Sequence, residues 1–415
     1  MQGIINKIFA REILDSRGNP TVEAVVVLNS GIVAKASCPS GASTGSHEAH
    51  ELRDGDIGRY GGKGVIRAVE NINNIISPAL IGKEASMQAD IDHIMIELDE
   101  TDNKSRLGAN AILAVSVAVA KAAAKYNKTE LYRYLGYDGK CKWPTPMLNI
   151  LNGGAHASNN LDIQEFMILP HLTTLPENIR AGSEIFHLLG SILRRDGYAT
   201  GVGDEGGYAP NLASDEDAIK MLCRAITEGG YRIENIGIAL DVAATEWYKD
   251  NQYTMPKRQK IASSSDLIQY YSDLCEKYPV LSIEDGLNED DFDGWKRMTD
   301  ALGKKIMLVG DDLFVTNPKR LSMGIKLGIG NSILIKPNQI GTLTETLKVI
   351  ELARGAGYKV IISHRSGETT DSYIADIAVA TGAEYIKAGA PCRGERVAKY
   401  NRLTEIYALE TQYEK

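Results

Sequence analysis

Cysteine is scarce in this chain, and its few cysteines are not arranged as a metal site or a disulfide framework. The 415 residues include five cysteines that lie far apart, with no Cys-x-x-Cys pair and no zinc-ligand spacing. An odd number of isolated cysteines indicates free thiols, which persist in a reducing compartment. The five are Cys38, Cys141, Cys223, Cys275 and Cys392.

The chain also lacks a long apolar run and an excess of basic charge. Charged residues interrupt the apolar ones in the first 20 residues, and no uninterrupted run of 18 apolar residues occurs. We therefore expect no membrane span and a cytoplasmic location. The formal net charge of −8 argues against direct nucleic-acid binding, because phosphate contacts require basic patches. An acidic enzyme can still take an anionic substrate if bound cations reverse the local field.

The first third of the chain changes from strand-like to helical patterning. Three strand-like runs cover residues 6–13, 21–28 and 32–38, and the turn Asn29-Ser30-Gly31 separates the last two, which predicts a small antiparallel meander. Residues 65–76, 87–98 and 109–126 have helical periodicity. Strands followed by helices predict an α+β domain.

The remaining chain alternates short β-branched runs with amphipathic helical runs. Residues 135–146 are rich in Gly, Tyr and Pro, so we predict a smaller N-terminal α+β domain at 1–138 and a second domain at 139–415. From Ile236 onward, six strand-like runs alternate with helical candidates such as residues 266–278 and 343–357. Such alternation predicts a parallel sheet, and six consecutive units favour a closed (β/α)8-type barrel of the α/β class.

Ionisable residues fall near the carboxyl end of each of these runs. In a parallel barrel all strand carboxyl ends open onto one face, so residues about one strand–helix unit apart gather at one mouth. An isolated Asp or Glu at such a position is more often a helix cap or a solvated loop residue, but six in register favour a site. The six are Asp241, Glu284, Asp311, Lys336, His364 and Lys387.

Three of these residues, Asp241, Glu284 and Asp311, form a set of hard oxygen ligands. With no Cys or paired His nearby, they suit Mg²⁺ better than zinc or copper. A structural Ca²⁺ site is the alternative, although no EF-hand loop is present. Lys336 and Lys387 lie among apolar residues, where a lysine is either an ion-pair partner or, beside a cation, a base.

Ten motifs in the sequence together resemble those of the enolase family, and they occur in the family's order. The resemblance extends from DSRGNPTVEA (residues 15–24) to RVAKYNRL (396–403), nearly the whole chain. The ten are SGASTG (40–45), NGGAHA (152–157), IQEFMI (163–168), GDEGGYAPN (203–211), LDVA (240–243), SIEDG (282–286), GDDLFVTNP (310–318), LIKPNQIG (334–341), SHRSGET (363–369) and IKAGAP (386–391).

This resemblance implies a reaction and roles for individual residues. It implies the reversible dehydration of 2-phospho-D-glycerate to phosphoenolpyruvate in glycolysis, with two Mg²⁺ per active site. Lys336 would be the base and Glu205 the acid. The metal ligands would be Asp241, Glu284 and Asp311 for the first ion and Ser43 for the second. The substrate would contact His156, Gln164, Glu165, His364, Arg365, Ser366 and Lys387.

Other functions are compatible with parts of this pattern. A sugar-acid dehydratase or racemase of the wider superfamily would carry a Lys-x-Lys base motif on an early strand, and residues 236–243 contain no lysine. The resemblance also implies a homodimer or an octamer built from dimers. An additional non-catalytic role is reported for some family members, either as a scaffold in an RNA-degradation complex or as a secreted, surface-bound plasminogen receptor.

Overall fold

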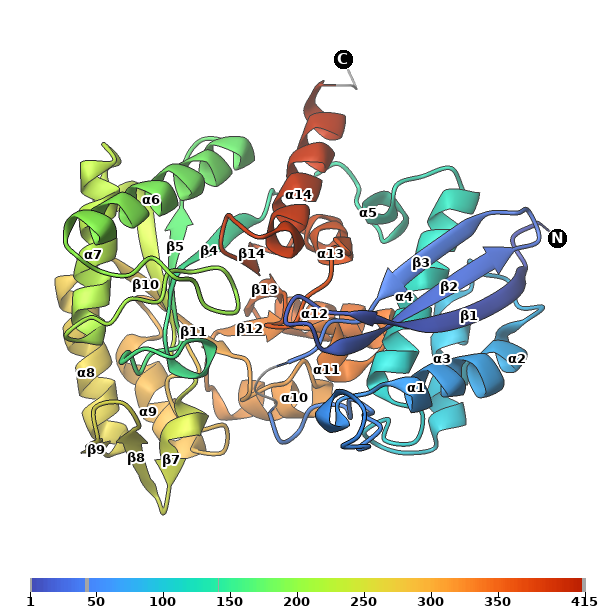
Figure 1. The fold of residues 1–415 in the computed structure, drawn as a ribbon, viewed down its shortest axis with the longest axis horizontal. Coiled ribbons are helices and arrows are strands. Elements are labelled where there is room, and N and C mark those ends of the chain that lie inside the picture. Colours follow the sequence, from blue (N-terminus) through green and yellow to red (C-terminus); the bar gives the residue numbers. More distant parts are fainter. Residues whose placement is uncertain (1, 42–44, 141, 413–415) are drawn as a thin grey trace.

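The N-terminal part contains the expected meander. The computed structural model describes residues 2–41, 45–140 and 142–412. Strands β1 (Ile5–Leu14), β2 (Pro20–Leu28) and β3 (Val33–Ser37) pair antiparallel in the order β1-β2-β3. Gly31 closes the β2–β3 turn with a φ of 85°, a conformation that glycine adopts without steric cost. Figure 1 shows this sheet at the right, in blue.

Helices follow the meander, as the periodicity predicts. They are η1 (Tyr60–Gly62), α1 (Ile66–Asn71), η2 (Ile72–Ile76), α2 (Ser77–Leu80), α3 (Gln88–Asp99), α4 (Ala109–Tyr126) and α5 (Leu131–Tyr134). The expected helix at 65–76 continues to Leu80, because α1, the π-helical turn η2 and α2 follow one another without a gap. α1, η2 and α2 pack against β1, and α4 packs against β2 and β3.

Among the described residues, one helix has the length and composition of a membrane span. This helix is α4, with a mean hydropathy of 1.2, and 83% of it is buried inside the protein. Its alanines allow the close packing against the meander that buries it.

The second part of the chain forms a closed eight-stranded barrel, with strand order β10-β11-β12-β13-β14-β4-β5-β6. This confirms the predicted fold class: an N-terminal α+β domain followed by a TIM-type barrel. The strands are β4 (Thr145–Asn152), β5 (Glu165–Pro170), β6 (Ile236–Asp241), β10 (Val280–Glu284), β11 (Met307–Gly310), β12 (Ser332–Ile335), β13 (Lys359–Ser363) and β14 (Tyr385–Gly389).

The barrel differs from a uniformly parallel one in a single strand. β5 runs antiparallel to both of its neighbours, β4 and β6, whereas the other neighbouring pairs are parallel. β4 and β5 are joined by the loop at 153–164, which contains the short η3 (Gly154–His156) and no crossover helix, so the chain reverses direction. As a result β5 begins, and does not end, at the mouth of the barrel.

Helices surround the barrel, and several begin at side-chain caps. Thr174, Ser214, Ser263, Asp291 and Thr342 each accept a backbone N–H at a helix start. The helices are α6 (Leu175–Arg195), α7 (Asp215–Glu228), η4 (Ile233–Asn235), η5 (Ala244–Trp247), α8 (Ser264–Lys277), α9 (Phe292–Leu302), α10 (Pro318–Leu327), α11 (Pro337–Ile340), α12 (Leu343–Gly355), α13 (Tyr373–Thr381) and α14 (Gly394–Gln412).

The barrel domain also contains a small separate sheet and an apolar barrel interior. β7 (Tyr248–Lys249), β8 (Gln252–Met255) and β9 (Lys260–Ala262) form a three-stranded antiparallel sheet after β6. The barrel interior is filled by Met147, Met167, Leu169, Ala239, Met307, Val309, Leu334 and Ile361. Because the barrel interior is apolar, the polar residues of the strands gather at one end of the barrel.

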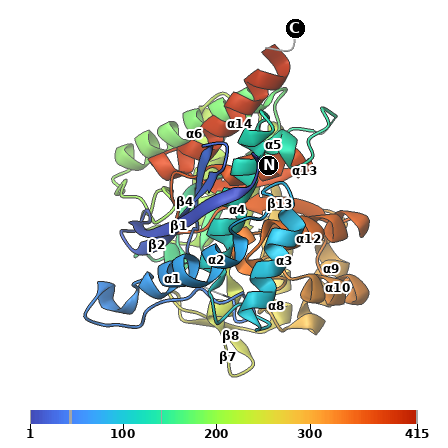
Figure 2. The same ribbon diagram turned by 90° about the vertical axis from the view of Figure 1, so that its right-hand side faces the viewer.

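The two parts of the chain pack directly on each other. α11 and α12 contact α4, α12 also contacts α3, and α13 contacts α5. Figure 2 shows the meander and α1–α3 in front of the barrel. The predicted boundary at residues 138 and 139 lies between α5 and β4, and its position stays a prediction. The four cysteines within the described residues are free, and Cys141 lies outside them.

Candidate active site

Acidic residues from three adjacent strands meet at the barrel mouth. Asp241 ends β6 and Glu284 ends β10, and these two residues are register partners in the parallel pair. Glu165 begins β5, and because that strand is antiparallel, it also pairs with Asp241. The reversed strand therefore brings a third carboxylate to the end of the barrel where the parallel strands finish.

Lys387 of β14 lies at the centre of these three carboxylates. Its Nζ is 2.9 Å from Asp241 Oδ2, 2.9 Å from both oxygens of Glu284 and 3.3 Å from Glu165 Oε1. Burial opposes the charge, but Asp241, Glu165 and Glu284 hold the pKa of Lys387 well above its usual value. Lys387 is therefore a fixed cation within the site.

Lys336 and Asp311 form a second ion pair at the mouth. Asp311 follows β11 and Lys336 follows β12, and the lysine Nζ donates to Asp311 Oδ2. The other oxygen of Asp311 accepts from Gln339 Nε2 at 2.9 Å. Asp285 accepts from the backbone N–H groups of Asp311 (3.0 Å) and Asp312 (2.7 Å), so it orients the loop that carries Asp311.

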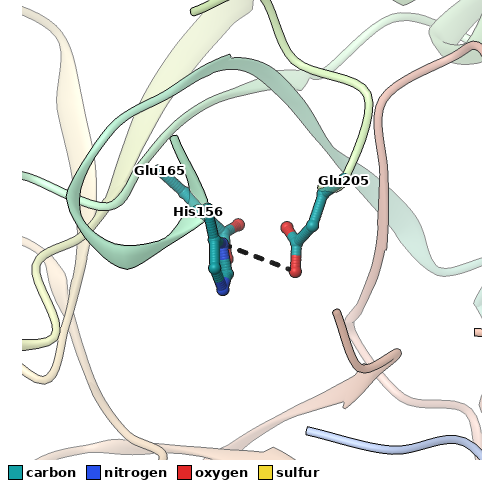
Figure 3. A group of neighbouring side chains, drawn as sticks. All are labelled: His156, Glu165 and Glu205. Carbon is teal, nitrogen blue, oxygen red and sulfur yellow. Dashed lines mark ion pairs between the residues drawn. The ribbon is translucent and has the colours of Figure 1, made fainter. Parts of the chain in front are cut away.

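Glu165, Glu205 and His156 form a compact buried group. Figure 3 shows the two carboxylates and the imidazole turned toward one another. His156 Nδ1 lies 3.6 Å from Glu165 Oε1 and 3.7 Å from Glu205 Oε1. The potential ligand atoms of the three side chains all lie within 4.8 Å of one another. Two carboxylates this close do not both ionise readily, so they favour sharing a proton.

The surroundings of the two carboxyl groups assign that proton to Glu165. Burial and the neighbouring Glu205 raise the pKa of Glu165 well above its usual value. Burial also acts to raise the pKa of Glu205, but its contacts with His364 and His156 and the charge of Arg396 outweigh burial and hold that pKa well below the usual value. The directions of the two pKa shifts therefore favour the proton on Glu165 and the negative charge on Glu205.

Glu205 is held by one neighbour that the sequence did not single out, Asn149, and by one that it did, His364. Asn149 of β4 donates to Glu205 Oε2 at 3.1 Å, and His364 Nε2 lies 3.5 Å from the same oxygen. Asn149 occupies an ordinary strand position, and its sequence neighbours carry no signal of this role. Asp285 and Asp312 were also missed, although the doubled acids of SIEDG and GDD could have indicated them.

Arg365 lies at the edge of the site, beside the N-terminal part of the chain. Its guanidinium donates to Glu48 at 2.8 and 3.1 Å and to Asn338 Oδ1 at 3.3 Å. Glu48 follows the SGASTG motif, so this pair joins that segment to the barrel. Ser43, predicted as a ligand of a second metal ion, lies outside the described residues.

One cavity collects nearly all of the predicted site residues. Glu284 is absent from its lining, but contacts it through Lys387. Gln164 also reaches Asp241, with its Nε2 at 3.5 Å from Oδ2. The cavity is lined by His156, Gln164, Glu165, Glu205, Asp241, Ala243, Asp285, Asp311, Asp312, Lys336, Ser363, His364, Arg365, Ser366 and Lys387.

The donor atoms around this cavity fit a hard divalent cation. Its lining includes carboxylates from Asp241, Asp285, Asp311 and Asp312 and no cysteine. Oxygens of Asp285, Asp311 and Asp312 lie within 4.8 Å of one another, and burial raises the pKa of Asp312 to about 8. Such a concentration of negative charge is stable only when cations balance it, and carboxylate oxygens suit Mg²⁺.

The fold and the site define a class of protein: a TIM-type barrel with buried acids and lysines at its mouth, where acidic groups could hold a metal ion. Two family models match the chain, the enolase N-terminal domain over residues 5–135 and the enolase C-terminal TIM barrel domain over residues 140–413. The chain belongs to the enolase family, and it is a metal-dependent hydro-lyase of that family.

An arginine from the small sheet holds the loop that leads into β5. Arg258 Nη2 lies 2.8 Å from Asp215 Oδ2, and its Nε lies 3.4 Å from Asp162 Oδ2. Both aspartates are fully buried. Asp215 Oδ1 also accepts from the backbone N–H of Asp162 at 3.0 Å. This cluster fixes the residues immediately before Gln164 and Glu165.

We expect Arg258→Ala to destabilise the protein by about 1–3 kcal/mol, because it leaves two buried carboxylates without their cation. Urea unfolding measures the loss, with Arg232→Ala as the matched control, since the Arg232 side chain is 80% exposed. An unchanged midpoint in Arg258→Ala would show that the cluster contributes nothing to stability.

The loss in Arg258→Ala should grow as the pH rises. Burial raises the pKa of Asp215 to about 6, and Arg258 acts to lower it, so removing the arginine raises it further. A carboxyl group whose pKa is raised by folding stabilises the protein at low pH and loses that contribution as the pH rises through the folded-state value. Unfolding at pH 5 should therefore show a smaller deficit than unfolding at pH 8.

Proposed function

We propose that the protein is a phosphopyruvate hydratase, which interconverts 2-phosphoglycerate and phosphoenolpyruvate. One observation carries the proposal: a lysine amine, Lys336, and a carboxyl pair, Glu165 and Glu205, line the same cavity as the acidic metal-ligand candidates. Removing water across a carbon–carbon bond needs a base for the C2 proton and an acid for the C3 hydroxyl.

Lys336 is the proposed base, and its contacts explain how it becomes one. Burial lowers its pKa, but Asp311 raises it above the usual value, so in this arrangement the amine is protonated. As a metal ligand, Asp311 would no longer hold the ammonium group of Lys336. The neighbouring cations Arg365 and Lys387 then favour the neutral amine, which can accept the C2 proton.

Asp241, Glu284 and Asp311 are the proposed ligands of the first Mg²⁺, and Ser43 of the second. Bound there, the two ions would offset the negative charge that develops on the substrate carboxylate when C2 loses its proton. Lys387 adds a fixed positive charge at the same place, since it already contacts Asp241 and Glu284.

The carboxyl pair supplies the acid. The raised pKa of Glu165 favours the shared proton on its carboxyl group, and Glu205 lies close enough to receive that proton or to pass it to the departing hydroxyl. Glu205 remains the proposed acid, with Glu165 as the source of its proton. Burial in the cavity keeps bulk water from competing for that proton.

The remaining lining residues are proposed to bind the substrate's anionic groups. Arg365, Ser366 and Lys387 would hold the carboxylate and phosphate, with His156, Gln164 and His364 nearby. Arg365 is already charged and directed by Glu48, so a phosphate would share or replace an existing ion pair.

The direct test is to mix the protein with Mg²⁺ and 2-phosphoglycerate and follow the ultraviolet absorbance of the enol product. We expect absorbance to grow, and to stop when a chelator is added. A protein that binds Mg²⁺ but yields no product would contradict the proposed reaction, while leaving its family membership intact.

Mg²⁺ should also raise the thermal stability of the substrate-free protein. A ligand that binds only the folded state at 100 times its Kd stabilises it by about 2.7 kcal/mol. We expect Asp241→Asn to lose most of this gain. Asp250→Asn is the matched control, because Asp250 lies exposed in the β7–β8 turn with a φ of 50°, which asparagine tolerates. Equal gains in both variants would remove Asp241 from the ligand set.

A further inference from the structure

A buried arginine, Arg396 of α14, connects the segments behind the carboxyl pair. Its side chain is fully buried. Nη1 donates to Arg365 O at 2.6 Å and Nη2 donates to Ser366 O at 2.5 Å. Nη2 also lies 3.2 Å from Asp204 O, next to Glu205 in the chain. One guanidinium therefore ties the loop after β13 to the loop that carries Glu205.

Arg396 also contacts the ring of His364, and this contact determines where the ring carries its proton. Arg396 Nη1 lies 2.6 Å from His364 Nδ1. A guanidinium can only donate hydrogen bonds, so Nδ1 must be the accepting, unprotonated nitrogen. In a neutral imidazole the proton then resides on Nε2. That nitrogen lies 3.5 Å from Glu205 Oε2.

A doubly protonated His364 does not fit this arrangement. It would direct an N–H at a guanidinium 2.6 Å away and add a second buried cation beside Arg396. The charged groups around the ring are Glu205, Glu368 and Arg396. Burial and Arg396 outweigh the two carboxylates and lower the pKa of His364 to about 4. The contact with Arg396 and the lowered pKa both indicate that the His364 ring is neutral.

We propose that Arg396 is a positioning residue that fixes His364 as its Nε2–H tautomer, so that Glu205 Oε2 receives neutral donors and Glu205 Oε1 carries the proton in dehydration. Asn149 Nδ2 is the second neutral donor, since it also bonds Oε2, at 3.1 Å. Oε1 instead faces His156 Nδ1, at 3.7 Å, within the group that includes Glu165.

The part of this inference that concerns Glu205 rests on the proposed function, whereas the tautomer of His364 does not. On this assignment His364 neither gives nor takes a proton during turnover. Its role is to anchor one oxygen of Glu205 and thereby to direct the other toward Glu165 and the cavity.

The test is ¹⁵N NMR of the whole protein labelled at histidine, without substrate. The chain has seven histidines, and His364→Gln identifies the His364 signals by their disappearance. We expect a protonated Nε2, an unprotonated Nδ1 and no titration of this ring between pH 5.5 and 8.5. A protonated Nδ1, or a ring that titrates near its ordinary value of about 6.5, would overturn the proposal.

Two variants of Arg396 separate positioning from simple packing. In Arg396→Lys the replacement can still only donate, so a folded variant should keep the Nε2–H tautomer. In Arg396→Gln the amide can also accept, so the Nδ1–H tautomer should appear in the spectrum. If both folded variants retain Nε2–H alone, Arg396 does not set the tautomer. If neither folds, the wild-type spectrum still decides the tautomer.

Kinetics then connects the tautomer to the chemistry. In a folded Arg396→Gln we expect the turnover of 2-phosphoglycerate to fall about 10-fold or more, and by a larger factor than KM changes. The lost contacts with Arg365 O and Ser366 O affect substrate binding, whereas the altered tautomer affects the proton of Glu205. An Nε2–H ring in a protein that does not dehydrate 2-phosphoglycerate would contradict the proposed function alone. An Nδ1–H ring in an active enzyme would contradict this inference alone.

Discussion

Replacing Lys336 with alanine is expected to lower the turnover of 2-phosphoglycerate by roughly 10²–10⁴-fold, the usual contribution of a positioned base. The amine lies at the cavity, bonded to Asp311, and the alanine variant has no group that can take the C2 proton. Exchange of that proton with deuterated solvent, followed by NMR, should be lost together with turnover, because both steps need the base.

Measurements of stability and metal binding distinguish a loss of the base in Lys336→Ala from misfolding of the variant. Lys336→Ala should remain folded and still respond to Mg²⁺, since Asp241, Glu284 and Asp311 are intact. Lys348→Ala is the matched control, because Lys348 lies exposed on α12, away from the cavity. A folded Lys336→Ala protein that turns over at a near-normal rate would remove Lys336 from the role of base.

Glu205→Gln is expected to slow dehydration by roughly 10²–10⁴-fold while exchange at C2 continues. Glutamine preserves the shape and the contact with Asn149 but cannot pass a proton to the C3 hydroxyl. Lys336 is untouched, so the C2 proton should still leave and return. The ratio of exchange to dehydration, measured on one sample in deuterated solvent, is the decisive quantity.

Two further variants are needed to interpret the Glu205→Gln result. Glu165→Gln should also slow dehydration, because Glu165 holds the shared proton and its oxygen contacts Lys387. Glu234→Gln, on an exposed side chain, should change neither step. If exchange and dehydration fall equally in Glu205→Gln, the acid lies elsewhere, and Glu165 becomes the first candidate.

Local patterns predicted most of the fold. The three strands of the meander and the helices α3, α4, α8 and α12 lie within a few residues of their predicted ranges. Helical periodicity and strand alternation depend on residues close in sequence, so they are readable without a structure. The spacing of acids and lysines along the repeated units was equally readable, because each unit ends at the same face of the barrel.

Other features depended on contacts between residues distant in sequence. The direction of β5 was not predicted, although it is the reversal that places Glu165 beside Asp241. Glu48 was also missed as the partner of Arg365, from which it is separated by 317 residues. No local pattern carries such pairings, because they arise only when the N-terminal part packs on the barrel.

The amino-acid sequence alone therefore determined the family, the barrel and the identity of the ionisable residues at its mouth, since these follow from motifs and from periodicity. The three-dimensional arrangement decided which of two neighbouring carboxyl groups holds the proton, and which ring nitrogen of His364 is protonated. Proton positions respond to burial and to charges a few ångströms away, and those distances exist only in the folded chain.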